Sequence, residues 1–459
     1  MGVKLEWQIE SDKRYKGNSE HSEDPQLRHQ RAARTRRVMF TIVAMLLVVV
    51  GVIWFLQQRL QLVDNRQRDL LENTVKAEIS ALNVGEETTF TGIQRSATLD
   101  WLNTQAVAYN QYQADKVGTD RVLTGRIYEV VMDGQRGRVQ LEEIENGTPY
   151  VLTWFYWNYD TITGTDGKVI EDGGWHHVAP DYTFWGQAAT LEQPQYSVRY
   201  QSLDEPFAKA LDTTLKTWFG VICTTVECGR LPYLTVDINA SPMASPSWVD
   251  GTTWQLLVPS PYRDRARHDQ PFDVSNQQQV ADVLAERLIT TYAVQADPNF
   301  DAAFFTEAAR LWFTGQWLQV DTQSYFMTSI AQQYGQGKIG QLLSGLRSNS
   351  DVSILATVLG TDPDVASLDW RDFLTWRLAL EAQAASSGDQ ATYLRLYDTR
   401  TDLMQQTALD RLSAYTPAQP VSMVTSQTAP DGTAQLVATT IDGQKIIFNW
   451  VNQVLVRAS

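Results

Sequence analysis

The sequence predicts an α+β protein in which one N-terminal transmembrane helix precedes three domains that each combine helices with a β-sheet. Three observations lead to this prediction. Residues 38–56 form an apolar run without a single charge. About 400 residues follow this run, which is more than one hydrophobic core usually holds. Helix-period and strand-period patterns occur in this remainder in three successive groups.

The apolar run VMFTIVAMLLVVVGVIWFL is long enough to cross a membrane, because a helix rises about 1.5 Å per residue and the hydrocarbon core is about 30 Å thick. Five arginines lie just before it: Arg28, Arg31, Arg34, Arg36 and Arg37. Basic residues beside a span stay on the cytoplasmic side. We therefore expect a disordered cytoplasmic tail (1–37), an uncleaved signal anchor that crosses the lipid bilayer of the cell membrane (38–57), and an extracytoplasmic remainder.

Charge and composition exclude some functions. The chain has a formal net charge of −15, and the tail before the span is net basic, so the extracytoplasmic part is strongly acidic. Such a charge argues against binding to nucleic acid. The sequence contains no phosphate-binding glycine loop and no nucleophile elbow, so we expect no cofactor.

The two cysteines of the chain, Cys223 and Cys228, are separated by four residues. In an oxidising compartment such a pair can close a small disulfide loop, with free thiols as the alternative. A zinc site would need two more ligands nearby, and the sequence around the pair offers none.

The first group, residues 65–195, begins with helical patterns and continues with strands. Helices are predicted at 63–82 and 99–112, and strands at 121–132, 138–145, 150–159 and 175–185. The pairs Asp133-Gly134 and Asn146-Gly147 are typical of two-residue hairpin turns. This order of elements, with strands such as VLTWFYW and GGWHHV, resembles the cone-shaped nuclear transport factor 2-like fold.

The last group, residues 365–459, repeats this order. Helices are predicted at 370–385, 390–397 and 401–413, and strands at 421–427, 435–441, 445–451 and 454–457. Asp442-Gly443 and Asn452-Gln453 are expected to form the turns. We predict a second, smaller cone-like domain here.

The middle group, residues 196–346, has a strand–helix–strand beginning and then two helices, at 280–292 and 302–317. It resembles the gluzincin metallopeptidases, in which the first helix of such a pair carries His-Glu-x-x-His and the second carries a Glu. Glu286 stands at the position of the general base, and Ala285 and Ile289 stand where the two zinc-binding histidines belong. Glu307 stands at the position of the third ligand.

The resemblance implies a peptidase-like domain that has lost both imidazoles and hence its zinc. That Glu286 and Glu307 are ordinary helix residues remains an equal alternative, since Glu is a good helix former. Another histidine pair, His176-His177, lies on a predicted strand, so its rings should point to opposite faces and one should pack in the sheet.

These observations together predict a membrane-anchored, extracytoplasmic, non-catalytic binding protein with an inactive peptidase-like domain, whose partner is an envelope protein, a peptide or a small ligand. A pure assembly scaffold and an active metallopeptidase or pocket enzyme with unrecognised site residues are the alternatives.

Overall fold

The computed structural model describes residues 25–163, 168–293, 298–320, 324–360 and 367–458. The protein is α+β, with 51% helix and 24% strand, and has a long apolar helix near the N-terminus, so the predicted α+β class and the predicted N-terminal apolar helix are confirmed. The chain divides into two compact units, Met1–Val75 and Lys76–Ser459, and each is described by itself.

The first unit is dominated by helix α1 (Pro25–Val84), which continues beyond residue 75 into the second unit. From Met39 on, α1 is long and apolar enough to cross a membrane, and none of its most apolar window is buried in the protein. Within the described part of the chain it is the one helix with these properties. The helix predicted at 63–82 is the uninterrupted continuation of the predicted span.

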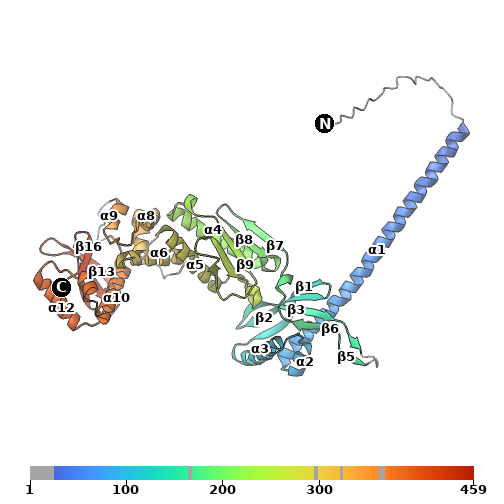
Figure 1. Cartoon of the computed structure of the whole chain (residues 1–459), viewed down its shortest axis with the longest axis horizontal. Helices are drawn as coiled ribbons and strands as arrows, with labels where there is room; N and C mark the ends of the chain where they lie inside the picture. Colours follow the sequence, from blue (N-terminus) through green and yellow to red (C-terminus); the bar gives the residue numbers. More distant parts are fainter. Residues whose placement is uncertain (1–24, 164–167, 294–297, 321–323, 361–366, 459) are drawn as a thin grey trace, which may run out of the picture. The chain divides into compact units, whose positions relative to one another are not determined.

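The second unit opens with two helices that lie beside an antiparallel sheet (Figure 1). The helices that follow α1 are α2 (Glu87–Ile93) and α3 (Leu99–Gly118). Four strands of this sheet are β1 (Val122–Asp133), β2 (Arg136–Glu145), β3 (Thr148–Tyr159) and β6 (Gly174–Val178). Two short strands, β4 (Ile162–Thr163) and β5 (Val169–Glu171), pair with each other.

The turns of this sheet test the sequence prediction. Asn146 and Gly147 have φ angles of 50° and 75°, as the predicted turn requires. The other turn was placed one residue too early, because Asp133 pairs with Arg136 and leaves Gly134 and the residue after it as the turn.

The strand predicted at 175–185 ends at Val178. Pro180 follows and cannot donate a ladder hydrogen bond, and the chain then forms a 3₁₀ turn, η1 (Tyr182–Phe184), capped by the Asp181 carboxylate. The prediction of one long final strand was therefore wrong in its second half.

A second sheet has the order β10-β11-β9-β8-β7. Its strands are β7 (Ala188–Glu192), β8 (Tyr196–Gln201), β9 (Leu234–Asn239), β10 (Ser247–Trp248) and β11 (Gln255–Pro259). The three central strands are parallel, and helix α4 (Glu205–Thr225) connects β8 to β9. β7 pairs with β8, so this sheet begins before residue 196, and the predicted boundary falls inside its first hairpin.

A two-residue strand, β12 (Ala266–Arg267), leaves the middle group and pairs with β3 of the first sheet. Short 3₁₀ turns complete this part of the chain: η2 (Ser202–Asp204), η3 (Cys228–Arg230) and η4 (Pro261–Arg263). Because the first and middle groups share a sheet, they are joined by backbone hydrogen bonds as well as by the chain.

Five helices follow: α5 (Val274–Tyr292), α6 (Phe300–Leu318), α7 (Tyr325–Tyr334), α8 (Gly337–Gly345) and α9 (Ile354–Leu359). α5 begins earlier than predicted because the Asp273 carboxylate caps it, accepting from the backbone N–H of Asn276 at 2.9 Å. α7, α8 and α9 were not predicted.

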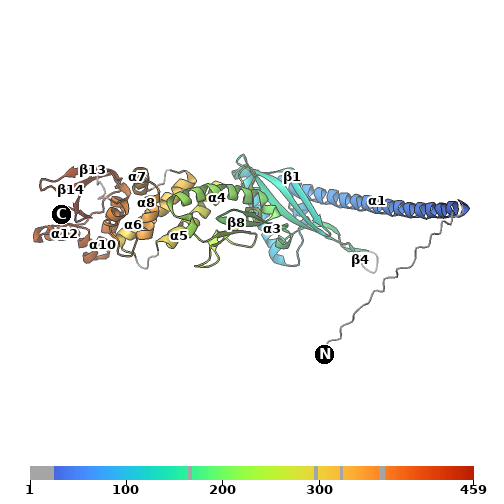
Figure 2. The same ribbon diagram turned by 90° about the horizontal axis from the view of Figure 1, so that it is seen from above.

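The C-terminal part packs three helices against a four-stranded antiparallel meander (Figure 2). The helices are α10 (Arg371–Ser387), α11 (Gln390–Arg395) and α12 (Asp402–Ser413). The strands are β13 (Val421–Thr428), β14 (Ala434–Thr440), β15 (Lys445–Val451) and β16 (Val454–Arg457). Asn452 and Gln453 have positive φ angles of 48° and 63°, which confirms the last predicted turn.

One cluster of buried apolar residues extends from Val151 in β3 to Leu455 in β16. Aromatic rings connect the middle helices to α10: the centroids of Phe304 and Phe373 are 4.9 Å apart, in a T-shaped arrangement. Helices α6 and α7 therefore share a core with the C-terminal part. The opposite face of α6 lies outside this core.

Candidate functional site

A cavity of about 420 Å³ lies between α5 and α6. Three of the four positions that carry the peptidase resemblance line it: Glu286, Ile289 and Glu307. The fourth, Ala285, is completely buried and does not line the cavity. The structure thus brings together the two carboxylates that the sequence singled out.

Helical spacing explains this convergence. On α5, Asp282, Glu286 and Ile289 are three or four residues apart and so share one face, and Ala293 follows directly after the helix. On α6, Glu307 and Arg310 are three residues apart, the separation at which helical side chains meet. The two faces contribute charged and apolar groups to the same hollow.

Arg310 organises the charges of the cavity. Its Nη2 and Nε donate to the two carboxylate oxygens of Glu307 at 2.7 and 2.9 Å, and its Nη1 donates to Asp282 on α5 at 3.2 Å. The hydrogen bonds to Glu307 are the main reason that the pKa of Arg310 is raised above its usual value. The guanidinium is therefore a fixed cation that ties the two helices together.

The cavity nevertheless has an excess of negative charge. Three carboxylates, those of Asp282, Glu286 and Glu307, face one guanidinium. Glu286 is exposed, and no described residue forms a salt bridge with it, although its charge contributes to the raised pKa of Arg310. Val283, Ile289 and Ala293 supply apolar wall, so the site combines acidic groups with a hydrophobic surface.

The residues present do not fit a catalytic zinc ion. A zinc site of this kind needs three protein ligands, and Ala285 and Ile289 provide none. Both oxygens of Glu307 are engaged by Arg310, whose charge would also repel a metal cation. Within the ranges that the structure describes, no group of three His, Cys, Asp or Glu residues could hold a metal ion.

The histidine pair forms no such site either. His177 is buried, and its Nδ1 lies 2.7 Å from Glu78, a carboxylate without solvent exposure. Tyr156 and Gln94 each donate to the same carboxylate at 2.7 Å. His176 points elsewhere and its ring contacts Tyr159, so the prediction of opposite faces with one packed ring is confirmed.

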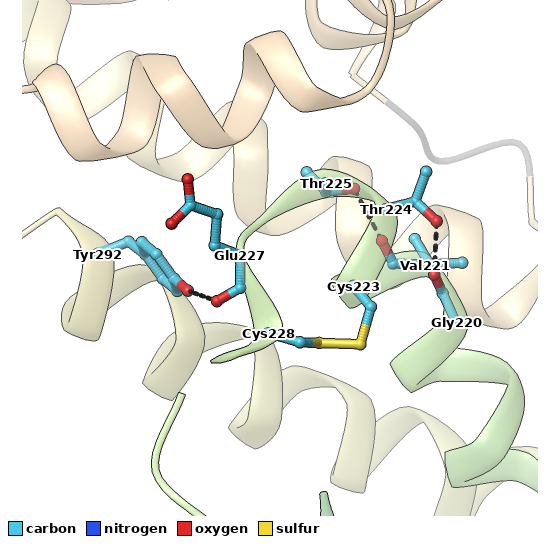
Figure 3. The surroundings of a disulfide bond; sticks show 8 residues. All are labelled: Gly220, Val221, Cys223, Thr224, Thr225, Glu227, Cys228 and Tyr292. Atoms are coloured by element: carbon cyan, nitrogen blue, oxygen red, sulfur yellow. Dashed lines mark hydrogen bonds between the residues drawn. A yellow bond between two sulfur atoms is a disulfide. The ribbon is translucent and has the colours of Figure 1, made fainter. Parts of the chain in front are cut away.

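The two cysteines form a disulfide at the C-terminal end of α4 (Figure 3). Their Cα atoms are 4.8 Å apart. Nearby, the Tyr292 hydroxyl at the end of α5 donates to the Glu227 carbonyl at 3.2 Å. α8 approaches the same end so closely that a Cβ on Gly340 would lie 2.1 Å from the Thr225 carbonyl oxygen. The bridge therefore fixes a packed helix end.

Comparison with protein-family models, with curated proteins and with solved structures finds no match to this chain. The site must therefore be interpreted from its own geometry. Sequence reasoning missed Arg310, although its spacing from Glu307 was a usable signal. Its second partner, Asp282, lies on another helix and only the tertiary structure shows it.

Proposed function

We propose that this protein is a membrane-anchored, extracytoplasmic binding protein, whose α5–α6 cavity holds a peptide through an ammonium group without cleaving it. The observation that carries this proposal is the Arg310 guanidinium bound to Glu307 and Asp282, at the place where a gluzincin would hold its metal.

Two further features support the proposed membrane anchoring and extracytoplasmic location. The arginines before the apolar helix favour a cytoplasmic N-terminus and an extracytoplasmic remainder. The disulfide fits an oxidising compartment. In this proposal the middle part is a degenerate gluzincin-like domain between two cone-like domains.

The charge of the cavity defines the ligand. Three carboxylates against one guanidinium favour a cation, and an α-amine or a lysine side chain is the cation that peptides supply. Val283 and Ile289 can contact the aliphatic part of such a residue. Glu286 is the group best placed to receive the ammonium, because no described residue forms a salt bridge with it.

The test is a binding titration with the full-length chain in nanodiscs. The probes are a fluorescein-labelled Ala-Lys-Ala-Lys-Ala peptide and its matched control with norleucine in place of lysine. We expect the lysine peptide to bind at least about tenfold more tightly, since that ratio corresponds to about 1.4 kcal/mol. Mass spectrometry after incubation should recover the peptide intact.

Two variants assign this binding to the cavity. Glu286→Gln should weaken lysine-peptide binding about fivefold, and Arg310→Met should strengthen it, because each changes the local charge by one unit in opposite directions. Asp410→Asn, on α12, is the matched control and should change nothing. Equal affinity for the two peptides, or cleavage that Glu286→Gln abolishes, would contradict the proposal, and the cleavage would establish the peptidase alternative.

A further inference from the structure

A second cavity, of about 560 Å³, lies in the C-terminal part between the helices α10–α12 and the strands β15 and β16. Side chains from the helices, from the strands and from the segments that follow α11 and α12 line it. Those that matter chemically are Tyr393, Tyr397, Arg411, Tyr415, Lys445 and Arg457. It shares no lining residue with the α5–α6 cavity.

The floor of this cavity is a closed polar network. The Glu381 carboxylate is only 2% exposed and forms an ion pair with Arg457. The Tyr397 hydroxyl donates to Glu381 at 2.7 Å, and the Tyr393 hydroxyl lies 2.9 Å from that of Tyr397. Because the single hydroxyl proton of Tyr397 goes to Glu381, Tyr393 must be the donor in the second bond. The negative charge of Glu381 is thus compensated inside the floor.

Two polar atoms at the cavity lack a partner. The Tyr415 hydroxyl and the Nε of Arg457 are buried, and no described residue forms a hydrogen bond with either. Burial raises the pKa of Tyr415 to about 12, so its hydroxyl carries a proton at neutral pH. Unpaired buried donors are rare and costly, and both would be satisfied by a ligand that brings hydrogen-bond acceptors.

The rim adds positive charge. Among the described residues, no carboxylate forms a salt bridge with Lys445 or Arg411, and Arg411 donates to the backbone carbonyl of Ala458 at 3.0 Å. Asp410, the one rim carboxylate among the residues that the structure describes, accepts a hydrogen bond from Gln406 at 2.9 Å. An entering molecule therefore meets two cations without a carboxylate partner, which is the reverse of the α5–α6 cavity.

The walls are aromatic and aliphatic. The rings of Tyr393 and Tyr397 stack with centroids 4.9 Å apart, and the Tyr415 ring meets Tyr393 edge-on at 6.0 Å. Ile446 and Ile447 of β15 complete the large apolar side chains of the lining, and Thr407, Thr416 and Gln444 add polar ones. Such walls suit a flat apolar body with one polar end.

We propose that this C-terminal cavity is a second binding site, which takes a small organic carboxylate with a flat apolar body. The carboxylate would accept from Tyr415 and from Arg457, with Lys445 and Arg411 supplying the attracting field. The apolar body would pack on the Tyr415 ring and on Ile447, the more exposed apolar side chains of the lining. This site is independent of the peptide site proposed above, so either can be wrong without the other.

The test uses fluorine NMR on full-length protein in nanodiscs, with empty nanodiscs as the blank. The three probes share one ring and differ in charge: 4-fluorobenzoate, 4-fluorobenzamide and 4-fluorobenzylammonium. We expect the anion to bind most tightly and the neutral amide about tenfold more weakly, since charged partners strengthen hydrogen bonds. The cation should bind least at this cavity, so any 4-fluorobenzylammonium held by the acidic α5–α6 cavity should be unaffected by substitutions in the C-terminal one.

Variants separate a ligand site from ordinary packing. Tyr415→Phe should weaken 4-fluorobenzoate binding about tenfold without lowering the melting temperature, because the lost hydroxyl has no partner among the described residues. Tyr393→Phe breaks a hydrogen bond and should lower the melting temperature. Lys445→Gln should weaken the anion only, and Asp282→Asn, in the other cavity, should leave the affinity for 4-fluorobenzoate unchanged.

Three results would overturn the proposal: equal affinity for 4-fluorobenzoate and 4-fluorobenzamide, no binding of 4-fluorobenzoate, or unchanged benzoate affinity in Tyr415→Phe. A fall in the melting temperature of Tyr415→Phe as large as that of Tyr393→Phe would also do so, because it would show that the Tyr415 hydroxyl is already satisfied in the free protein.

Discussion

Arg310 and Arg457 each face a cavity and each pair with a glutamate on a helix, but their surroundings differ. The Arg310 side chain is 28% exposed and its partner Glu307 is 41% exposed. The Arg457 side chain is 13% exposed and Glu381 only 2%. Solvent therefore screens the first pair more strongly than the second. The same pair of residue types therefore tunes the charge of one cavity and builds the floor of the other.

Replacing each arginine in turn tests this difference, and it should change the free energy of unfolding more than any other variant discussed below. Arg457→Met leaves the Glu381 charge buried without its ion-pair partner, which costs about 3–5 kcal/mol of unfolding free energy. Arg310→Met removes a half-exposed pair and should cost less than about 1 kcal/mol. Urea unfolding of the two variants in parallel measures both losses.

The double variant Glu381→Leu/Arg457→Met is the control for that comparison. It should recover most of the lost stability, since replacing a buried ion pair by apolar groups of similar size is often neutral. If the two single variants lose the same free energy, the proposed division between a tuning arginine and a structural arginine is wrong.

Removing the disulfide tests whether the stability of the protein can be lowered without changing the affinity of either cavity for its ligand. Replacing Cys223 and Cys228 by serine releases a short loop, which should cost about 2 kcal/mol in the chain-entropy model. The bridge lies near the end of α5, beside Tyr292. We expect thermal melting to show the loss, while the affinities for the lysine peptide and for 4-fluorobenzoate stay unchanged. A changed benzoate affinity would show that the disulfide-bonded end of α4 is coupled to the C-terminal cavity.

Raising the salt concentration should weaken ligand binding at both cavities, and to a different extent at each. This difference is expected to be smaller than the effects of the substitutions above. Screening acts strongly on exposed charges, and the Debye length falls from about 10 Å at 0.1 M to about 3 Å at 1 M ionic strength. Over that range we expect lysine-peptide binding at the half-exposed α5–α6 cavity to weaken about fivefold. Benzoate binding at the more enclosed floor should weaken about twofold. Titrations at both salt concentrations measure the two slopes, and a steeper slope for benzoate would reverse the assignment.

Local pattern was enough to predict much of this structure. The apolar run 38–56, the helix pair α5–α6 and the C-terminal hairpin at Asn452-Gln453 all follow from residue periodicity or turn chemistry. The strand β12 could not be predicted, because two residues carry no period and their partner, β3, is distant in the sequence. The short helices α7 and α8 were missed as well.

The sites, too, have features that the sequence could predict and features that only the tertiary structure shows. The resemblance to the gluzincins implied that Glu286 and Glu307 face one another, and both line the α5–α6 cavity. It could not reveal that Arg310 reaches Asp282 on another helix, or that His177 meets Glu78. The C-terminal cavity was invisible for the same reason, since Tyr393, Tyr415 and Arg457 come from separate elements.

The most direct test of the proposed non-catalytic role of the α5–α6 site is its zinc content. Full-length protein would be loaded with zinc, desalted and analysed by mass spectrometry of the metal, with Glu307→Gln as the matched variant. We predict no retained zinc in either protein, because Arg310 occupies Glu307 and no imidazole is present at Ala285 or Ile289. About one zinc per chain, lost in Glu307→Gln, would contradict this prediction and identify a metal centre, since such sites bind tightly.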